Sequence, residues 1–262
     1  MSAWRKILIL LMLLFFVVGL AVFLYPYIQG SITDRYMEER AQEVIEHIQS
    51  EQTKPEVIIP APTETIPEVS QRDHLELWEA MTIYNETLWE QRQSGLCDPW
   101  AYEQPSFTLG DYGLEDEAFG VLSIPAIDLR MPLYLGAEYD HMAAGAAHLS
   151  QTSLPIGGDN SNCVIAGHRG WGGASYFRYI TDLCPGDTVY VINLWETLAY
   201  TVEETKIIDP NDMEDILIQP GRDMLTLLTC HPYASGGKQR YVVYCVRDET
   251  FISDEQEVES AY

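Results

Sequence analysis

Two segments of this sequence carry side chains that could perform nucleophilic chemistry. The first, NCVIAGHRG, ends an apolar run just before His168, and the second, DMLTLLTCHPYASGGKQRYVV, places Cys230 at the end of another apolar run. A thiol attacks a carbonyl carbon as the thiolate, which a nearby imidazolium favours, and a guanidinium can stabilise the oxyanion that forms. Arg240 opens the next apolar run, ten residues after Cys230. If a loop returns the chain beside itself, Arg240 lies near Cys230, and the spacing indicates a Cys, His and Arg site.

Each of these residues also has an ordinary structural explanation. A cysteine at a strand end is usually a small buried apolar residue, and a histidine beside glycine often belongs only to a turn. His231 and His148 are alternative imidazoles, although the strand pleat predicts that His231 points away from Cys230. Arg169 is an alternative guanidinium, which by the same alternation faces away from His168. Composition and spacing therefore leave the site as a hypothesis.

The elements that must position these residues are short strands. After residue 118, brief apolar runs alternate with Gly, Pro and Asp, a texture typical of a mostly β barrel or sandwich. We expect strands at residues 120–124, 131–135, 162–166, 188–194, 197–208, 224–230 and 240–246, and short helices at 141–147, 175–183 and 211–217.

The N-terminal part predicts a membrane anchor. From Ile7 to Leu24 the chain has 18 residues without a charge, long enough to span a bilayer, and bulky aromatic residues follow where a signal peptide would carry a small-residue cleavage site. Arg5 and Lys6 precede this run, and the residues after it are acidic. The positive-inside rule then leaves the N-terminus in the cytoplasm and the rest of the chain outside the cell membrane.

Between the anchor and the β region the pattern changes three times. Residues 31–53 have the pattern of a helix, and the next stretch, KPEVIIPAPTETIPEVS, reads as an extended linker because its prolines preclude a helix. Residues 73–93 again form an amphipathic helical pattern, which we expect to pack against the domain. Residues 95–117 form a long loop, and loops of this length tend to be functional or disordered.

The charge balance excludes one class of partner. Fifteen Lys and Arg residues face 40 Asp and Glu residues, giving a formal net charge of −25. A domain this acidic lacks the electrostatic footprint of a nucleic-acid binder. Nucleic acid is therefore not an expected partner.

No metal or other cofactor is expected. The chain has five cysteines, Cys97, Cys163, Cys184, Cys230 and Cys245, and their spacings match no zinc framework. Because the count is odd, at least one thiol stays unpaired within the chain. The acidic residues Asp209, Asp212, Glu214 and Asp215 could hold calcium in an exported protein, but a solvated surface is the better explanation.

Longer stretches around the reactive residues resemble the sortase transpeptidase family. They are LPIGGDNSNCVIAGHRG, ETLAYTVEETKIIDP and TLLTCHPYASGGKQRYVV, which follow the family's order and spacing and include its TLxTC motif. The resemblance covers residues 119–247. It implies an eight-stranded sortase barrel with Cys230 as nucleophile, His168 as acid and base, and Arg240 as oxyanion and substrate clamp.

A second match resembles class C, the pilin-polymerising sortases. Asp98, Pro99 and Trp100 lie in the long loop before the barrel and look like the DPW or DPF lid of that class. The resemblance implies that Asp98 pairs with Arg240 and that Trp100 covers Cys230. Two features depart from class C: the sequence has TCHPYASGGKQR where TCTPYG and an Asn-rich stretch are usual, and no second apolar stretch matches the C-terminal membrane helix that such enzymes often carry.

The fold class expected is therefore mostly β, an eight-stranded sortase-type barrel with short helices, preceded by N-terminal helices and a lid loop. We expect a cytoplasmic N-terminus at residues 1–6, a transmembrane anchor at 7–25, a juxtamembrane helix and Pro-rich linker at 26–72, an N-terminal helix and lid loop at 73–117, a catalytic barrel at 118–250 and an acidic tail at 251–262.

The activity that the resemblance implies is transpeptidation at the cell membrane. Cys230 cleaves an LPxTG-like sorting signal through a thioester, and a pilin lysine amine resolves that thioester, so the partners are sorting-signal proteins, pilins and the membrane. Three alternatives stay open: a housekeeping sortase that joins proteins to a peptidoglycan precursor, a cysteine protease that uses water, and a non-catalytic extracellular binding module.

Overall fold

Eight strands form a closed barrel in the order β1-β2-β3-β4-β7-β8-β6-β5. The computed structural model describes residues 3–52, 74–93, 96, 107–212 and 214–251. The strands are β1 (Ala118–Ile124), β2 (Leu129–Leu135), β3 (Ala146–His148), β4 (Ser161–Ala166), β5 (Thr188–Asn193), β6 (Thr197–Ile208), β7 (Asp223–His231) and β8 (Gln239–Arg247). The mostly β fold class predicted from the sequence, with eight strands closed into a barrel, is confirmed.

The pairing of the strands decides which residues meet. β2 pairs with β3, and β4 with β7, in parallel, whereas the other neighbours are antiparallel. In the parallel pair of β4 and β7, Ser161 lies opposite Asp223 and Ala166 opposite Leu228. Both strands therefore end at the same end of the barrel.

The predicted strands occur with ends shifted by at most two residues, and one strand was missed. Residues 141–147 were predicted to be helical, but the helix α3 (Tyr139–Ala144) stops before Gly145 and the chain continues as β3. Three residues show no alternation that sequence could reveal. The strand exists because its backbone bridges β2 and β4.

Short helices connect the strands. The helix predicted at residues 175–183 is the 3-10 helix η4 (Tyr176–Asp182), and that predicted at 211–217 is the single turn η5 (Glu214–Ile216). Two further 3-10 turns, η2 (Leu109–Tyr112) and η3 (Pro125–Ile127), flank β1.

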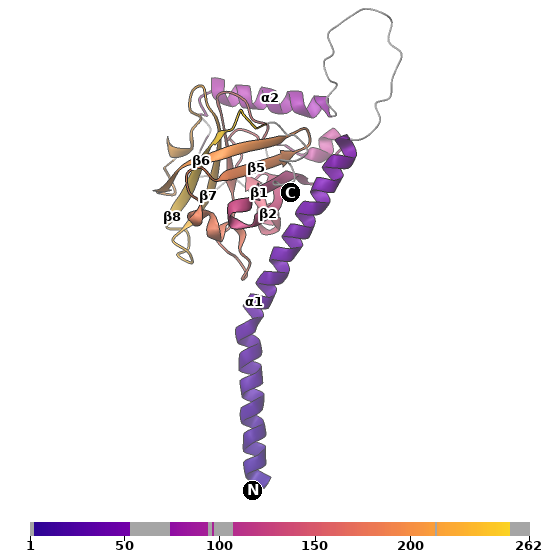
Figure 1. Cartoon of the computed structure of the whole chain (residues 1–262), viewed down its shortest axis with the longest axis vertical. Coiled ribbons are helices and arrows are strands. Elements are labelled where there is room, and N and C mark those ends of the chain that lie inside the picture. Colours follow the sequence, from indigo (N-terminus) through magenta and orange to yellow (C-terminus); the bar gives the residue numbers. More distant parts are fainter. Residues whose placement is uncertain (1–2, 53–73, 94–95, 97–106, 213, 252–262) are drawn as a thin grey trace, which may run out of the picture.

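The N-terminal anchor and the helix after it form one continuous helix, α1 (Ala3–Gln52), that runs through Pro26. The anchor predicted at residues 7–25 and the helical pattern at 31–53 therefore lie on one helix, and the boundary between them stays a prediction. Residues Trp4–Gln52 form a helix long and apolar enough to cross a membrane, and the apolar window is fully exposed. In Figure 1 the N-terminal half of α1 projects well beyond the barrel, while its C-terminal half lies along the barrel. The Pro-rich linker lies almost wholly outside the described residues.

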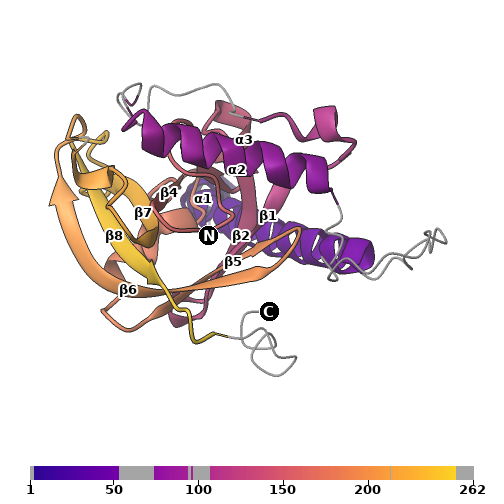
Figure 2. The same ribbon diagram turned by 90° about the horizontal axis from the view of Figure 1, so that it is seen from above.

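The second half of α1 packs on the barrel with one face. Its buried residues, Met37, Ala41, Val44, Ile45 and Ile48, recur at the spacing of a helix face. Four of these, all but Met37, share a hydrophobic cluster with Leu77 and Met81 of α2 (Leu75–Glu90) and with Phe119 of β1. Figure 2 shows α2 lying across the barrel, as expected for a helix that packs against the domain.

Two isoleucine substitutions, one on the buried face of α1 and one on its exposed face, distinguish the contribution of packing to stability from that of helix propensity. Ile45 is 2% exposed, whereas Ile32 on the same helix is 57% exposed. We expect Ile45→Ala to lower the free energy of unfolding by about 2–4 kcal/mol through lost burial and a residual cavity. Ile32→Ala should change it by less than about 0.5 kcal/mol. Unfolding of the detergent-solubilised chain in urea measures both, and equal midpoints would contradict this packing.

Candidate active site

Cys230 and Arg240 face each other across two antiparallel strands. Cys230 is the penultimate residue of β7, and Arg240, near the start of β8, is its register partner. A side chain built on Gly237, in the loop between the strands, would meet Arg240 Nη1 at 3.2 Å and Cys230 Sγ at 3.3 Å. The guanidinium and the sulfur therefore lie around the same glycine, as the loop-return argument from sequence predicted.

The Arg240 side chain is held by the same loop. Its Nη1 donates a hydrogen bond to the carbonyl oxygen of Gly237 at 2.7 Å, and a longer one to that of Gln239 at 3.2 Å. The residue is only 7% exposed. A buried, oriented guanidinium beside a sulfur is suited to stabilise a developing oxyanion.

His168 reaches the same end of the barrel from β4. The ladder of β4 and β7 continues past Ala166, because Gly167 N–H donates to Leu228 O at 3.1 Å and Thr229 Oγ1 donates to Gly167 O at 2.7 Å. His168 follows directly and thus lies beside the end of β7 that carries Cys230. The structure brings the three predicted residues to one place on the barrel rim.

Two aromatic rings that the sequence analysis did not single out enclose His168. The ring of Trp171 lies 5.2 Å from that of His168, and the ring of Tyr176 packs edge-on at 5.6 Å. Partial burial lowers the pKa of His168, because desolvation disfavours the imidazolium. An aromatic residue three positions after a histidine, as in HRGW, was the available signal in the sequence.

Burial and charge act in opposite directions on the Cys230 thiol. Burial raises the pKa of Cys230, and the positive charges of Arg240 and Arg169 lower it, with burial the larger effect. Together with the lowered pKa of His168, this makes the resting pair a protonated thiol and a neutral imidazole at neutral pH. The two arginines reduce the cost of forming the thiolate.

Arg169 is closer to the thiol than its position in the sequence suggested. Its Nη1 donates to His231 Nδ1 at 2.5 Å. Its charge nevertheless acts on Cys230. Strand alternation predicts the side of the chain on which a residue lies, but it does not predict how far a long arginine side chain extends across the rim.

His231 and His148, the two alternative imidazoles of the sequence analysis, lie in surroundings that differ from those of His168. His231 contacts Arg169 and stacks on Tyr241 with ring centres 5.9 Å apart. Partial burial and the charge of Arg169 lower the pKa of His231. His148 is fully buried, with Nε2 3.1 Å from the carbonyl oxygen of Thr152, and burial lowers its pKa to about 4. His148 is therefore a neutral core residue at physiological pH.

The remaining thiols lie away from the rim. Cys163, Cys184, Cys230 and Cys245, the cysteines in the described part of the chain, are all free. Cys163 and Cys245 are buried in the barrel core, and burial raises the pKa of both. Cys184 is exposed. Cys230 is thus the described cysteine that combines partial access with nearby cations.

The structure describes residues of the acidic cluster but not those of the predicted lid. Asp98, Pro99 and Trp100 lie outside the described residues, so the lid stays a prediction. In the acidic cluster, Asp215 forms an ion pair with Lys206. Within residues 3–52, 74–93, 96, 107–212 and 214–251, no group of three or more His, Cys, Asp or Glu side chains is arranged to hold a metal.

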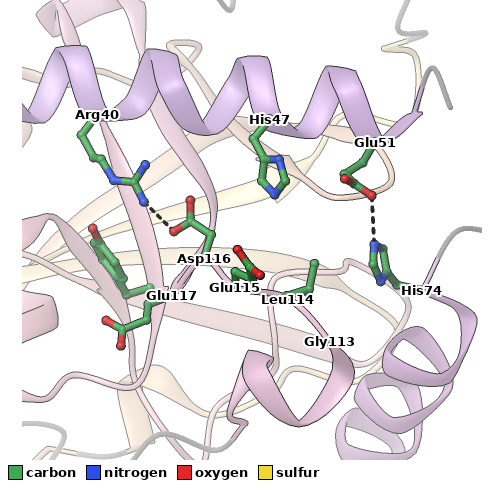
Figure 3. A pocket seen from close by; sticks show the side chains of 10 residues that line it. Arg40, His47, Glu51, His74, Gly113, Leu114, Glu115, Asp116 and Glu117 are labelled. Carbon is green, nitrogen blue, oxygen red and sulfur yellow. Dashed lines mark hydrogen bonds and ion pairs between the residues drawn. The ribbon is translucent and has the colours of Figure 1, made fainter.

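A cavity of about 840 Å³ lies elsewhere, between α1 and residues 113–117. Figure 3 shows Arg40 directed at Asp116, with Nη2 to Oδ1 at 2.5 Å, and His74 directed at Glu51 at 3.7 Å. None of Cys230, His168 and Arg240 lines this cavity. Its polar contacts join α1 to the barrel and to the start of α2, so it is a structural junction and not the reactive centre.

Comparison with known proteins matches this arrangement to one family. Residues 122–248 match the family model of the sortase domain. The curated protein sortase D of Bacillus subtilis is 30% identical over 130 residues, which cover 49% of this chain and 63% of that relative. The match thus spans less than two thirds of the relative's own length.

Solved structures resemble a larger part of the chain. A sortase C of Streptococcus pneumoniae, described with regard to catalysis and pilin substrate specificity, is 30% identical, with a TM-score of 0.67 over 82% of this chain and 99% of that one. Sortase C1 of GBS pilus island 1 is 26% identical, with a TM-score of 0.67 over 83% of this chain and 94% of its own. Both similarities extend beyond the barrel into the N-terminal helices.

The electrostatic coupling of Arg240 to Cys230 predicts a shift in thiol reactivity. Because a guanidinium favours the thiolate, Arg240→Ala should raise the Cys230 pKa further and move the pH profile of alkylation up by about one to two pH units. Arg222→Ala, which removes an arginine paired with Glu203 at the opposite end of β7, is the matched control and should not move the profile.

Iodoacetamide labelling followed by mass spectrometry measures these rates, and Cys230→Ala gives the background from the other thiols. An unchanged profile in Arg240→Ala would show that the guanidinium does not act on the sulfur.

Proposed function

Because this chain belongs to the sortase family, we propose that it is a membrane-anchored cysteine transpeptidase of class C type. It cleaves an LPxTG-like sorting signal between Thr and Gly and joins the new carboxyl end to a lysine amine of a pilin. The catalytic unit is the barrel of residues 118–250, held on the outer face of the cell membrane by the first half of α1.

The observation that carries this proposal is the meeting of three groups on one barrel rim. Cys230 is the register partner of Arg240 on β8. His168 lies beside the end of β7, through the parallel ladder of β4 and β7. A nucleophile, a proton-transfer group and an oxyanion stabiliser are what thioester chemistry requires.

Each group has a defined step. Cys230 transfers its thiol proton to His168, and its Sγ attacks the carbonyl carbon of the threonine in the sorting signal. Arg240 stabilises the negative charge on the carbonyl oxygen of the tetrahedral intermediate. His168 donates a proton to the glycine nitrogen as the C–N bond breaks, which leaves a thioester on Sγ and a free amine.

The second half reaction reverses these roles. The lysine amine attacks the thioester carbonyl carbon, His168 accepts the proton that the amine loses, and the C–S bond breaks to return the thiol. Arg240 stabilises the second oxyanion in the same way. The net result is the exchange of one amide bond for another, which needs no external energy source or cofactor.

Support for the pilin acceptor comes from the class C likeness. The solved sortase C structures share the barrel and the N-terminal helices with this chain. The sequence motif of Asp98, Pro99 and Trp100 adds the lid of that class. Asp98 pairs with Arg240, and Trp100 covers Cys230, so that the lid opens before a sorting signal enters.

Removing the reactive groups tests the proposal. Cys230→Ala, His168→Ala and Arg240→Ala should each lower turnover of a sorting-signal peptide by at least about 10²-fold, and pairwise losses should not add, because the groups act as a unit. Mass spectrometry of the products with and without a lysine-bearing pilin domain measures the reaction. Cys184→Ala, which removes an exposed thiol, is the matched control and should keep near-normal turnover.

The product masses separate this function from its alternatives. An amide-linked pilin product supports the proposal. A hydrolysed peptide alone indicates a protease, and ligation only to a peptidoglycan-derived amine indicates a housekeeping sortase. Near-normal turnover in Cys230→Ala would overturn the cysteine mechanism altogether.

The lid makes a separate prediction. Because a closed lid competes with substrate, activity follows the open fraction. Asp98→Ala/Trp100→Ala should therefore raise the alkylation rate of Cys230 at fixed pH, and circular dichroism checks that the variant is folded. Equal rates in the parent and this variant would mean that the loop does not occlude the thiol.

A further inference from the structure

The membrane helix touches the loop that follows His168, backbone against backbone. A Cβ atom added to Gly30 of α1 would lie 2.2 Å from the carbonyl carbon and oxygen of Gly173. One added to Gly173 would lie 2.1 Å from the carbonyl oxygen of Pro26. Gly173 also has a φ of +92°, which side chains rarely adopt. Only glycine fits on either side of this contact.

One helical turn beyond Gly30, the Asp34 carboxylate accepts hydrogen bonds from the same loop with both oxygens. Asp34 Oδ1 accepts a hydrogen bond from the backbone N–H of Ser175 at 2.8 Å. Asp34 Oδ2 accepts a second from Ser175 Oγ at 3.1 Å. Hydrogen bonds to a carboxylate are stronger than neutral ones, so this bidentate contact fixes the position of Ser175.

The next residue carries the restraint to His168. Tyr176 has a φ of +42°, a left-handed conformation that costs about 1–3 kcal/mol in a residue with a side chain and persists only where its surroundings enforce it. Its hydroxyl donates to Ala143 O at 2.7 Å, and its ring packs edge-on against His168. Phe177 N–H then donates to His168 O at 2.8 Å, which closes the loop.

We propose that Asp34 and Gly30 of the membrane helix are positioning residues for catalysis, which hold the loop of residues 168–177 so that Tyr176 orients the His168 ring. This inference rests on the proposed function, since it assigns His168 the proton-transfer step. Neither residue touches the reacting atoms. Both act through Ser175 and Gly173.

The contact also fixes how far the reactive rim stands from the bilayer. Gly30 follows the last residue of the apolar run, Leu24, by six positions, which corresponds to about 9 Å along a helix. The loop that carries His168 thus docks on α1 close to the point where the helix leaves the membrane. A substrate tethered in the same membrane meets the rim without a long reach.

The first test breaks the carboxylate contact in the full chain, solubilised in detergent. Asp34→Ala should lower kcat by about tenfold with KM changed less than twofold, because a misplaced proton-transfer group slows the chemical step. Ser175→Ala keeps the backbone N–H bond to Asp34 and should lower kcat by less. The double variant should match the Asp34→Ala single variant, because Asp34→Ala already removes both hydrogen bonds. Ser175→Thr keeps the hydroxyl and should restore most of kcat.

Glu38→Ala is the matched control for the helix contact. Glu38 lies one turn beyond Asp34 and pairs with Arg130 of β2 at 3.3 Å. Its loss should leave kcat within twofold of the parent. A role of Asp34 in stability alone would lower the melting temperature without the selective fall in kcat.

The second test uses the glycine pair. Gly30→Val must displace the loop backbone, whereas Gly19→Val on the same helix has no atom of the chain within 4 Å to displace. Both exchanges replace a glycine by the poor-to-moderate helix former valine within one helix, so Gly30→Val should lower kcat through the displaced loop and Gly19→Val should not. If Gly30→Val fails to fold, Asp34→Ala and Ser175→Thr still decide the question.

The outcomes distinguish this inference from the proposed function. If Cys230→Ala abolishes turnover while Asp34→Ala and Ser175→Ala keep the parental kcat, the positioning role is overturned and the transpeptidase stands. Additive losses in the double variant also overturn it. If Cys230→Ala retains turnover, the proposed function fails, independently of Asp34.

Discussion

The parallel hydrogen-bond ladder between β4 and β7 is the constraint on which the reactive rim depends. Its register, with Ala166 opposite Leu228, sends both strands out at the same end of the barrel. Because the two strands advance together, the residues just beyond this pair, His168 and Cys230, arrive side by side. The antiparallel return of β8 then adds Arg240 opposite the sulfur. A slip of one residue in either ladder would turn alternate side chains to the other face and separate the three groups.

The electrostatics of the rim oppose the charge of the whole chain. A net charge of −25 disfavours a further negative charge on a thiolate, and partial burial of Cys230 adds to that cost. Arg240 and Arg169 offset part of it, while the burial of His168 among aromatic rings keeps its imidazole neutral. Burial and the two guanidinium groups therefore act in opposite directions on the thiol, as Arg240 and Arg169 favour the thiolate that burial disfavours.

The helix α1 joins a long exposed apolar segment to the barrel without a break. It continues through Pro26 and passes directly from its exposed apolar half to the face that packs on the barrel. Its contacts with the His168 loop and with residues 113–117 are made by Asp34 and Arg40, less than two turns apart on the same helix. The exposed apolar half of α1 is therefore joined to the barrel by several contacts of the half that follows it.

Local patterns in the sequence determined the long apolar helical segment, the β class and seven strand positions, and they marked the three residues that meet at the barrel rim, because each of these depends on near neighbours in the chain. Alternating apolar runs marked the strands, and the TLxTC stretch with its following arginine marked the thiol. The three-residue strand β3 was missed because its pairing partners, and not its own residues, create it. The sequence patterns did not address whether the apolar run and residues 31–53 form one helix, and the structure joins them through Pro26. The reach of Arg169 to Cys230 and the hydrogen bonds of Asp34 to Ser175 were decided by the tertiary structure alone, since each joins residues far apart in the sequence through a geometry that exists only once the barrel has closed.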